Sequence, residues 1–293
     1  MEWTYDQIAA AVKANIGGTV SDADALLMVQ AGLSDALAGI DPRDNRSHVW
    51  SFLRTLTSMT FYATKTGTMA VSGVGSTTIT DAVNTPFCRQ MIGATLVAGT
   101  SGTEYTISGY TSTSIVTVSA SAAADNGRTF TITPDGIYEP PVNFGGLADR
   151  LVYAYNANFR PHMEEADAET VLAMWRNSNS VGYTYRYALI SASQLTSATQ
   201  GYKFIVAPVP TEDMLVKCRH ILNLAVPAAG EYLPGGMRFS QLVRSASLAQ
   251  VEKTYGHTQA TWQATAQRDM IAAIDADKLL FRTTDDVCRM RKG

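Results

Sequence analysis

The 293-residue chain is poor in charge, in cysteine and in long apolar runs, and each shortage excludes a class of protein. Charged residues make up only 17% of the chain, below the usual quarter, which suits a protein whose surface is largely covered in an assembly. The formal net charge of -3 leaves no basic excess for nucleic-acid binding. No apolar run approaches the roughly 20 residues of a membrane span, so we expect no membrane contact.

The three cysteines, Cys88, Cys218 and Cys288, are an odd number and have no CxxC spacing. They predict reduced thiols in a protein made in the cytosol, not a disulfide framework or a zinc site. The N-terminal stretch MEWTYDQIAAAVKANIGG lacks the basic start and the long apolar core of a secretory signal, so we expect none.

Motifs of catalytic and cofactor chemistry are also missing. Gly73 and Gly75 begin a dinucleotide-type glycine pattern, but its third glycine is absent. The sequence has no Walker lysine, no GxSxG elbow and no HExxH motif. His162 and Glu165 could offer two metal ligands, but a surface histidine beside a helix-start carboxylate is the plainer interpretation. We therefore predict no catalytic residue, no metal site and no cofactor, and hence a protein that is not an enzyme.

Two further groups of residues allow a functional and a simpler interpretation. Five tyrosines stand at every second position of two segments: Tyr153, Tyr155, Tyr183, Tyr185 and Tyr187. They could form a sugar-stacking strip, but the spacing favours one face of paired strands, where aromatic pairs are common. Four acidic residues stand in pairs: Asp275, Asp277, Asp285 and Asp286. We expect them to be solvated, because nothing in the sequence indicates the desolvation that an acid/base pair requires.

Helical periodicity marks both ends of the chain. Apolar residues recur every three or four positions in 4–16 and 21–40, where Thr4 and Ser21 or Asp22 are suitable N-caps. The same spacing returns in 239–249 and 262–274. A short helix capped by Asp167 is expected in the strand-rich region before these two stripes. The threonine-rich and aromatic stretch at 49–64 favours extended chain.

Period-two alternation replaces this pattern between Thr66 and Thr133. About six short strands are expected there, separated by turns such as Asn126-Gly127, a strong hairpin signal. We therefore predict an α+β protein: an α-helical bundle with a few carrier strands and an inserted small antiparallel β-sandwich or barrel domain. The predicted parts are a discontinuous helical core (1–62 and 134–280), the inserted β-domain (63–133) and a C-terminal arm (281–293).

Four loose motifs add a resemblance. They are a W-x-F, a P-x-x-F-G loop, a P-x-P strand end and an LA-x-x-E helix, at Trp50 to Phe52, Pro141 to Gly145, Pro208 to Pro210 and Leu248 to Glu252. With the order of the segments, they make most of the chain outside the insert resemble the head-to-tail adaptor (connector) proteins of tailed bacteriophages. The insert resembles the β-domain that many phage neck proteins carry at this point.

The resemblance implies a structural virion protein at the head-tail junction, assembled in the host cytoplasm. Its copies, usually 12, would form a ring beneath the portal, above a tail tube, nozzle or tail-fibre protein. DNA would pass through the channel without sequence-specific binding. The C-terminal arm would dock into the portal through Phe281, Arg282, Arg289, Met290, Arg291 and Lys292.

Two other functions stay open. One is a carbohydrate-binding or fibre-attachment module of the virion neck, which would use the tyrosine rows or the β-insert. The other is a cell-wall hydrolase, an activity associated with one branch of the adaptor family.

Overall fold

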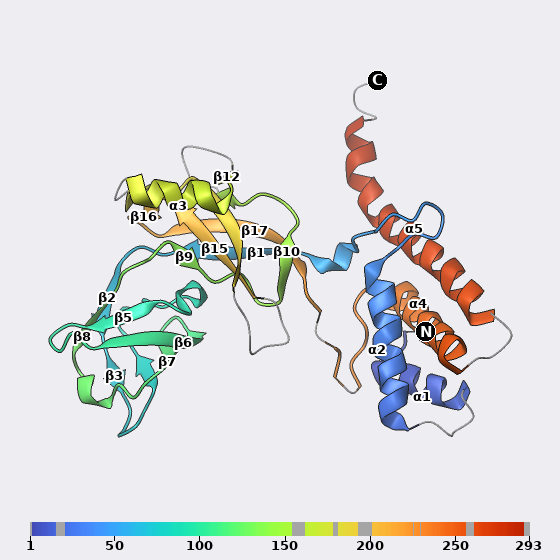
Figure 1. Cartoon of the computed structure of the whole chain (residues 1–293), viewed down its shortest axis with the longest axis horizontal. Coiled ribbons are helices and arrows are strands. Elements are labelled where there is room, and N and C mark those ends of the chain that lie inside the picture. The colour runs from blue at the N-terminus through green and yellow to red at the C-terminus, as the bar shows by residue number, and fades with distance from the viewer. Residues whose placement is uncertain are drawn as a thin grey trace. The chain divides into compact units, whose positions relative to one another are not determined.

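The computed structural model describes residues 2–15, 21–153, 162–177, 181–192, 201–224, 226–228, 230–255 and 261–289 (Figure 1). The chain divides into two compact units. Met1–Arg54 and Asn223–Gly293 together form one, called the helical unit below, and Thr55–Leu222 forms the other, called the β unit.

The described residues of the helical unit form four α-helices: α1 (Tyr5–Asn15), α2 (Asp22–Ala38), α4 (Gly236–Tyr255) and α5 (Thr261–Arg289). Helix α4 is central and packs against the other three. Helix α2 begins where the Ser21 side chain accepts a hydrogen bond from the Asp24 backbone N–H, and it ends at Gly39, whose φ of 59° is left-handed. The Gln7 backbone N–H donates to Thr4 Oγ1 at the start of α1, as the sequence predicts.

Small residues let α2 and α4 approach closely. A Cβ atom placed on Gly32 would lie 2.4 Å from Ser247 Oγ and 2.5 Å from Ser247 N, so only glycine fits there. An aromatic cluster joins Trp50 and the short 3-10 turn Ser51–Leu53 to α4: the ring of Phe239 lies 5.1 Å from that of Trp50 and 4.8 Å from that of Phe52.

The β unit contains a sandwich of two sheets. Sheet A consists of β1 (Arg54–Phe61), β17 (Met214–Leu222), β10 (Phe144–Leu147) and β11 (Val152–Tyr153). Sheet B consists of β12 (Glu164–Glu165), β14 (Arg186–Ala192), β15 (Gly201–Ala207) and β9 (Ile137–Tyr138). Their inner faces meet in one core, where Phe144 of sheet A lies 5.6 Å from Phe204 of sheet B.

Helix α3 (Ala168–Asn177) covers the outer face of sheet B (Figure 1). Val171 of the helix is buried against Ala188 and Ile205, and the indole N–H of Trp175 donates to the Val206 carbonyl at 2.9 Å. The order of layers is therefore α3, sheet B, sheet A. Two further strands, β13 (Val181–Gly182) and β16 (Val209–Pro210), form a separate parallel pair.

The remaining seven strands form one antiparallel sheet that nearly closes on itself. They are β2 (Lys65–Thr68), β3 (Ala70–Val71), β4 (Thr78–Thr80), β5 (Thr95–Ala98), β6 (Glu104–Ser112), β7 (Ile115–Val118) and β8 (Thr129–Ile132). Its edge strands β2 and β3 are separated in sequence only by Met69, which is fully buried. The Met69 N–H donates to Arg128 O at 2.8 Å, and its carbonyl accepts from Gly127 N at 2.7 Å, so one bent segment joins both edges.

The predicted fold class is wrong, because strands, not a helical bundle, dominate the core. Residues 134–222, which the sequence assigned to the helical core, supply most of the sandwich and contain one helix, α3, among those described. The error has a physical cause. Several of these strands are short, and their partners are distant in sequence: Tyr138 of β9 pairs with Phe204, and Phe144 of β10 pairs with Leu222. Local periodicity carries no information on such pairing.

The boundaries between the two compact units fall after Arg54 and after Leu222. The inserted domain expected from the sequence had its bounds at 63 and 133. The backbone of α5 continues to Arg289, through the first residues assigned to a C-terminal arm.

Candidate functional site

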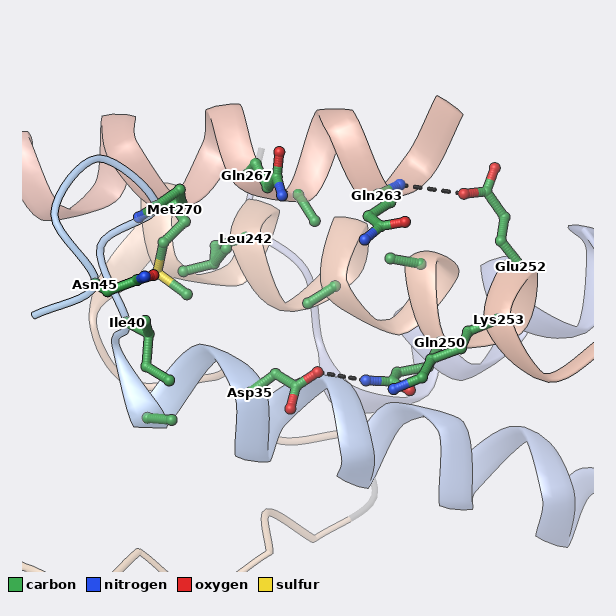
Figure 2. A pocket seen from close by; sticks show the side chains of 15 residues that line it. Asp35, Ile40, Asn45, Leu242, Gln250, Glu252, Lys253, Gln263, Gln267 and Met270 are labelled. Carbon is green, nitrogen blue, oxygen red and sulfur yellow. Dashed lines mark hydrogen bonds between the residues drawn. The ribbon is translucent and has the colours of Figure 1, made fainter. Parts of the chain in front are cut away.

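An open groove of about 650 Å³ lies on the helical unit, between α2, α4, α5 and the loop after α2 (Figure 2). Its floor is apolar because α4 presents Leu242, Ala246 and Ala249 towards it, while α5 adds Ala266 and Met270. These are the helical stripes that the sequence predicts. Small side chains on α4 let it sit deep between its neighbours, and the space left above it forms the groove.

Polar side chains form the rim of the groove. The Glu252 carboxylate accepts from the Trp262 backbone N–H at 2.9 Å and from the Gln263 N–H at 3.1 Å, so it caps the start of α5. Across the groove, the amide of Gln250 donates to Asp35 of α2 (Figure 2). Both carboxylates thus already have hydrogen-bond donors within the unit.

The lining suits an apolar or amphipathic protein segment better than a reacting small molecule. Its 15 residues include no histidine and no cysteine, and its charged members are Asp35, Glu252 and Lys253. An apolar floor with amide and carboxylate groups on the rim is typical of surfaces that receive a helix or loop of a partner.

A cluster of carboxylates holds α5 next to the loop after α2. Asp277 is 7% exposed, and it accepts from His48 Nε2 at 2.8 Å, Ser51 N at 3.0 Å and Ser51 Oγ at 2.5 Å. Arg43 bridges Asp41 and Asp275 with distances of 2.8 Å to each. The expectation that Asp277 is solvated is therefore wrong, whereas Asp275 is half exposed.

Hydrogen bonds from Arg43 hold the pKa of the Asp41 carboxyl well below its usual range. The same guanidinium is the main cause that lowers the pKa of Asp275. Both groups are thus ionised at neutral pH, and the cluster acts as a set of charge-assisted contacts between α5 and the loop.

Serine, histidine and aspartate meet in this cluster, but not as a nucleophile and its base. In a catalytic triad the histidine lies between the serine and the aspartate. Here Ser51 Oγ donates directly to Asp277 Oδ1, and His48 contacts the other carboxylate oxygen. The geometry orients the carboxylate and anchors α5; it does not activate the serine hydroxyl.

The two candidate metal ligands of the sequence, His162 and Glu165, each have another neighbour in the structure. His162 lies 3.4 Å from Arg150 through its Nε2, and Glu165 is paired with Tyr187 in β12 and β14. No group of three histidine, cysteine or acidic side chains within the described ranges is arranged to hold a metal ion.

The tyrosine rows do not form a surface strip. Tyr153 and Tyr187 are buried in the core of the β unit, and the Tyr153 hydroxyl donates to Thr184 O at 2.7 Å. Tyr183 is exposed and lies 5.3 Å from the Tyr153 ring, while Tyr155 lies outside the described residues. The two buried rings lie in different sheets, Tyr153 on β11 and Tyr187 on β14, so the prediction of one face of two paired strands is also wrong.

The predicted portal-docking residues fall at the end of the described chain. Phe281, Arg282 and Arg289 belong to the backbone of α5. Met290, Arg291 and Lys292 lie outside the described residues.

Two features of the helical unit, the groove and a stacked arginine, do not follow from the sequence patterns. The Arg244 guanidinium lies 4.7 Å from the Trp3 ring and 5.7 Å from the Trp262 ring. The helical stripes gave a signal for the groove floor, since three of their residues, Ala246, Ala249 and Ala266, are small and line it. No local pattern in the sequence indicates that Trp3 and Trp262, which are far apart in the chain, both lie against Arg244.

Neither a comparison with protein-family models nor one with curated proteins finds a match for the chain. Among the described helices, none combines the length and the apolar character that crossing a bilayer requires.

Proposed function

We propose that this chain is a structural subunit of a closed ring at the head-tail junction of a tailed bacteriophage, assembled in the host cytoplasm. The groove on the helical unit is the observation that carries the proposal. The groove has an apolar floor and a polar rim, on a unit whose helices are otherwise packed through small residues. A concave surface of this kind can receive a helix or loop of a partner chain.

The motifs behind the resemblance support a structural role. Trp50 and Phe52 pack on Phe239, Phe144 lies in the sandwich core, and Glu252 of the LA-x-x-E motif caps α5. Each of these residues makes a packing or capping contact that shapes the fold. The resemblance to head-to-tail adaptors itself stays a prediction.

A ring of this kind needs a heterologous contact, in which one surface of a subunit binds a different surface of its neighbour. The portal above and a tail tube, nozzle or fibre protein below would be the other partners, and DNA would pass through the channel unbound. Docking into the portal would fall to the C-terminal segment from Phe281. The anchors of α5 at Asp275 and Asp277 precede that segment, so its removal would leave them in place.

Mass measurement and negative-stain microscopy of the purified chain, alone and with portal, test the proposal. Twelve subunits of 31.5 kDa would give a closed particle of about 380 kDa. Truncation after Leu280 should keep the ring and weaken its co-sedimentation with portal. The proposal is wrong if the chain is a compact monomer at every concentration, or if the particle it forms does not bind portal.

The alternative functions have cheap tests of their own. A turbidity assay on peptidoglycan would reveal a cell-wall hydrolase, and a glycan array would reveal a carbohydrate-binding module. Burial of Tyr153 and Tyr187 removes two rings from the proposed sugar-stacking strip, so a glycan site would have to use other residues.

A further inference from the structure

Basic side chains from three separate segments of the β unit meet on the outer face of sheet A. Strand alternation defines this face, because Val216, Cys218 and His220 of β17 are buried in the core and the residues between them point outward. Lys217 is exposed there and Arg219 is half-buried. Two positive charges thus follow each other at about 6.7 Å along the middle of one strand.

Two more basic side chains stand beside this pair. Val152 of β11 is paired with Lys217 on one side and with His162 on the other, so the three side chains lie on the same face. Nη1 of Arg150 lies 3.4 Å from His162 Nε2, which places this arginine next to the row. We call Arg150, His162, Lys217 and Arg219 the basic cluster.

The positive charge of the basic cluster is not neutralised by the β unit itself. None of the four side chains forms an ion pair in the part of the chain that the structure describes, and the contact between Arg150 and His162 joins two bases. The carboxylates nearest in sequence are Asp149, whose Oδ1 accepts from the Arg150 backbone N–H at 2.8 Å, and Glu165 of sheet B. The formal net charge of -3 conceals this local excess, because the cluster assembles from three segments. Such a patch attracts anions.

Hydroxyl groups adjoin the basic cluster on its other side, where β1 is the neighbour of β17. The Ala63 N–H, just after β1, donates to Asp213 Oδ1, just before β17, at 3.0 Å, so the two strands run antiparallel. Ser58 and Thr60 therefore lie beside the middle of β17, on the outward positions of β1. Serine and threonine hydroxyls, together with lysine and arginine, are the groups that contact phosphate oxygens in protein–DNA complexes.

The arrangement of charged and apolar residues distinguishes between classes of partner. Leu56, 62% exposed, is near the start of β1, and Leu215, 48% exposed, is near the start of β17, so the antiparallel strands place them towards opposite ends of the face. Between them the basic cluster occupies the middle, with Val152 as the apolar side chain among the charges. Protein–protein interfaces usually have the reverse order, an apolar centre and a polar rim. A basic and polar centre is typical of a nucleic-acid interface.

We propose that the basic cluster binds the phosphate backbone of DNA without reading its sequence. Duplex DNA carries one charge per about 1.7 Å of its axis, so several phosphates can approach the cluster at once. Arg150, Lys217 and Arg219 neutralise phosphates. Ser58 and Thr60 donate hydrogen bonds to phosphate oxygens.

Contacts of this kind are weak and reversible. Their dissociation constants are about 10⁻⁴ to 10⁻⁶ M at physiological salt, so DNA can move across the face without being retained. The contact involves the β unit alone and does not depend on the proposed ring.

Binding of a fluorophore-labelled duplex DNA, followed by fluorescence anisotropy over a series of salt concentrations, tests the proposal. The cluster variant is Lys217→Glu with Arg219→Glu. The control is Arg46→Glu with Arg268→Glu, which changes the net charge by the same amount at two exposed positions of the helical unit. Circular dichroism and thermal unfolding first establish that both variants are folded.

Wild type and the control should bind the duplex within about threefold of each other, since distant charges are screened. The logarithm of the association constant should fall with the logarithm of salt concentration at a slope of about -2 to -3. The cluster variant should bind at least about tenfold more weakly at low salt, with a slope smaller by about 2. Equal binding of the cluster variant and wild type, or an equal loss in the control, overturns the proposal.

Two other polyanions separate DNA from other sources of negative charge. Polyglutamate represents an acidic protein surface, and vesicles that contain phosphatidylserine represent a membrane. At equal concentration of negative charge, the duplex should bind more tightly than both. Tighter binding of polyglutamate or of the vesicles overturns the proposal.

Single variants cover the case in which the cluster variant does not fold. Arg150 is exposed between β10 and β11, outside the paired strands. Arg150→Glu should weaken duplex binding about threefold and reduce the salt slope by about 1. Asp149→Asn removes the adjacent carboxylate and should strengthen binding about twofold at low salt. Unchanged binding in both variants overturns the proposal.

Discussion

Replacement of Asp277 by alanine should loosen α5 from the loop after α2. Three hydrogen bonds end on this carboxylate, two from Ser51 and one from His48, and its side chain is almost fully buried. Alanine would leave the Ser51 N–H and the His48 ring without their acceptor in a site that water reaches poorly. The unpaired donors, more than the lost volume, would cause the destabilisation.

The size of the effect follows from the number of bonds and the burial. Removal of one partner from a buried, charged hydrogen-bond network costs about 3 kcal/mol of unfolding free energy. Asp277→Asn keeps the shape and part of the bonding, so about 1 kcal/mol is expected. With a urea m-value of about 2 kcal/mol/M, the midpoint should fall by about 1.5 M for alanine and about 0.5 M for asparagine.

Urea unfolding followed by tryptophan fluorescence would measure these shifts. Trp3, Trp50 and Trp262 belong to the helical unit, and Trp175 is the tryptophan of the β unit. A Trp175→Phe background therefore makes the signal specific for the helical unit. Since the two units can unfold in separate transitions, this separation is needed to treat the transition as two-state.

Asp275→Ala is the matched control, because Asp275 is on the same helix and its ion pair with Arg43 is half exposed on both sides. Solvent screening makes such a pair weak, so its midpoint should move much less than that of Asp277→Ala. The reasoning is refuted if Asp277→Ala shifts the midpoint by less than the control, or if Asp277→Asn is as damaging as alanine.

Three other substitutions or conditions test the packing. Gly32→Ala should lower the unfolding free energy of the helical unit by about 2 kcal/mol, since the new methyl group collides with the backbone of Ser247. Burial lowers the pKa of His220, so as pH falls below about 6.5 the unfolded state takes up a proton before the folded state does. The β unit should therefore lose stability on acidification, and His220→Leu should remove this loss. Burial raises the pKa of the Cys88 thiol to about 11 and that of Cys218 to about 12, so mass spectrometry should find both protected from iodoacetamide until urea is added.

Each of these outcomes has a control within the chain. Gly182→Ala meets no atom within 4 Å, so it should be nearly neutral where Gly32→Ala is not. For His220, neither ring nitrogen has a hydrogen bond of good geometry within the described ranges, and the Cys218 backbone opposes the lowered pKa only in part. Equal acid sensitivity of wild type and His220→Leu, followed by Trp175 fluorescence, would contradict that prediction. Rapid labelling of Cys88 or Cys218 in the folded protein would contradict the third.

Local periodicity was sufficient to locate the helices of this protein. The apolar stripes and caps near Thr4, Ser21 and Asp167 predict α1, α2 and α3, and the C-terminal stripes predict α4 and α5. Period-two alternation likewise located strands between Lys65 and Ile132. These signals are local because a helix satisfies its hydrogen bonds within one segment and a strand alternates along its own length.

Which strands pair, and what each layer covers, depends on contacts between residues far apart in the chain. The sequence could not reveal that β17 lies beside β1, that Asp277 bonds to His48, or that α3 covers sheet B. The groove exists because helices from separate segments leave a space between them. Whether a surface stays uncovered depends on how the segments pack. A stripe of apolar residues belongs to one segment, and its sequence is the same whether a partner or water covers it.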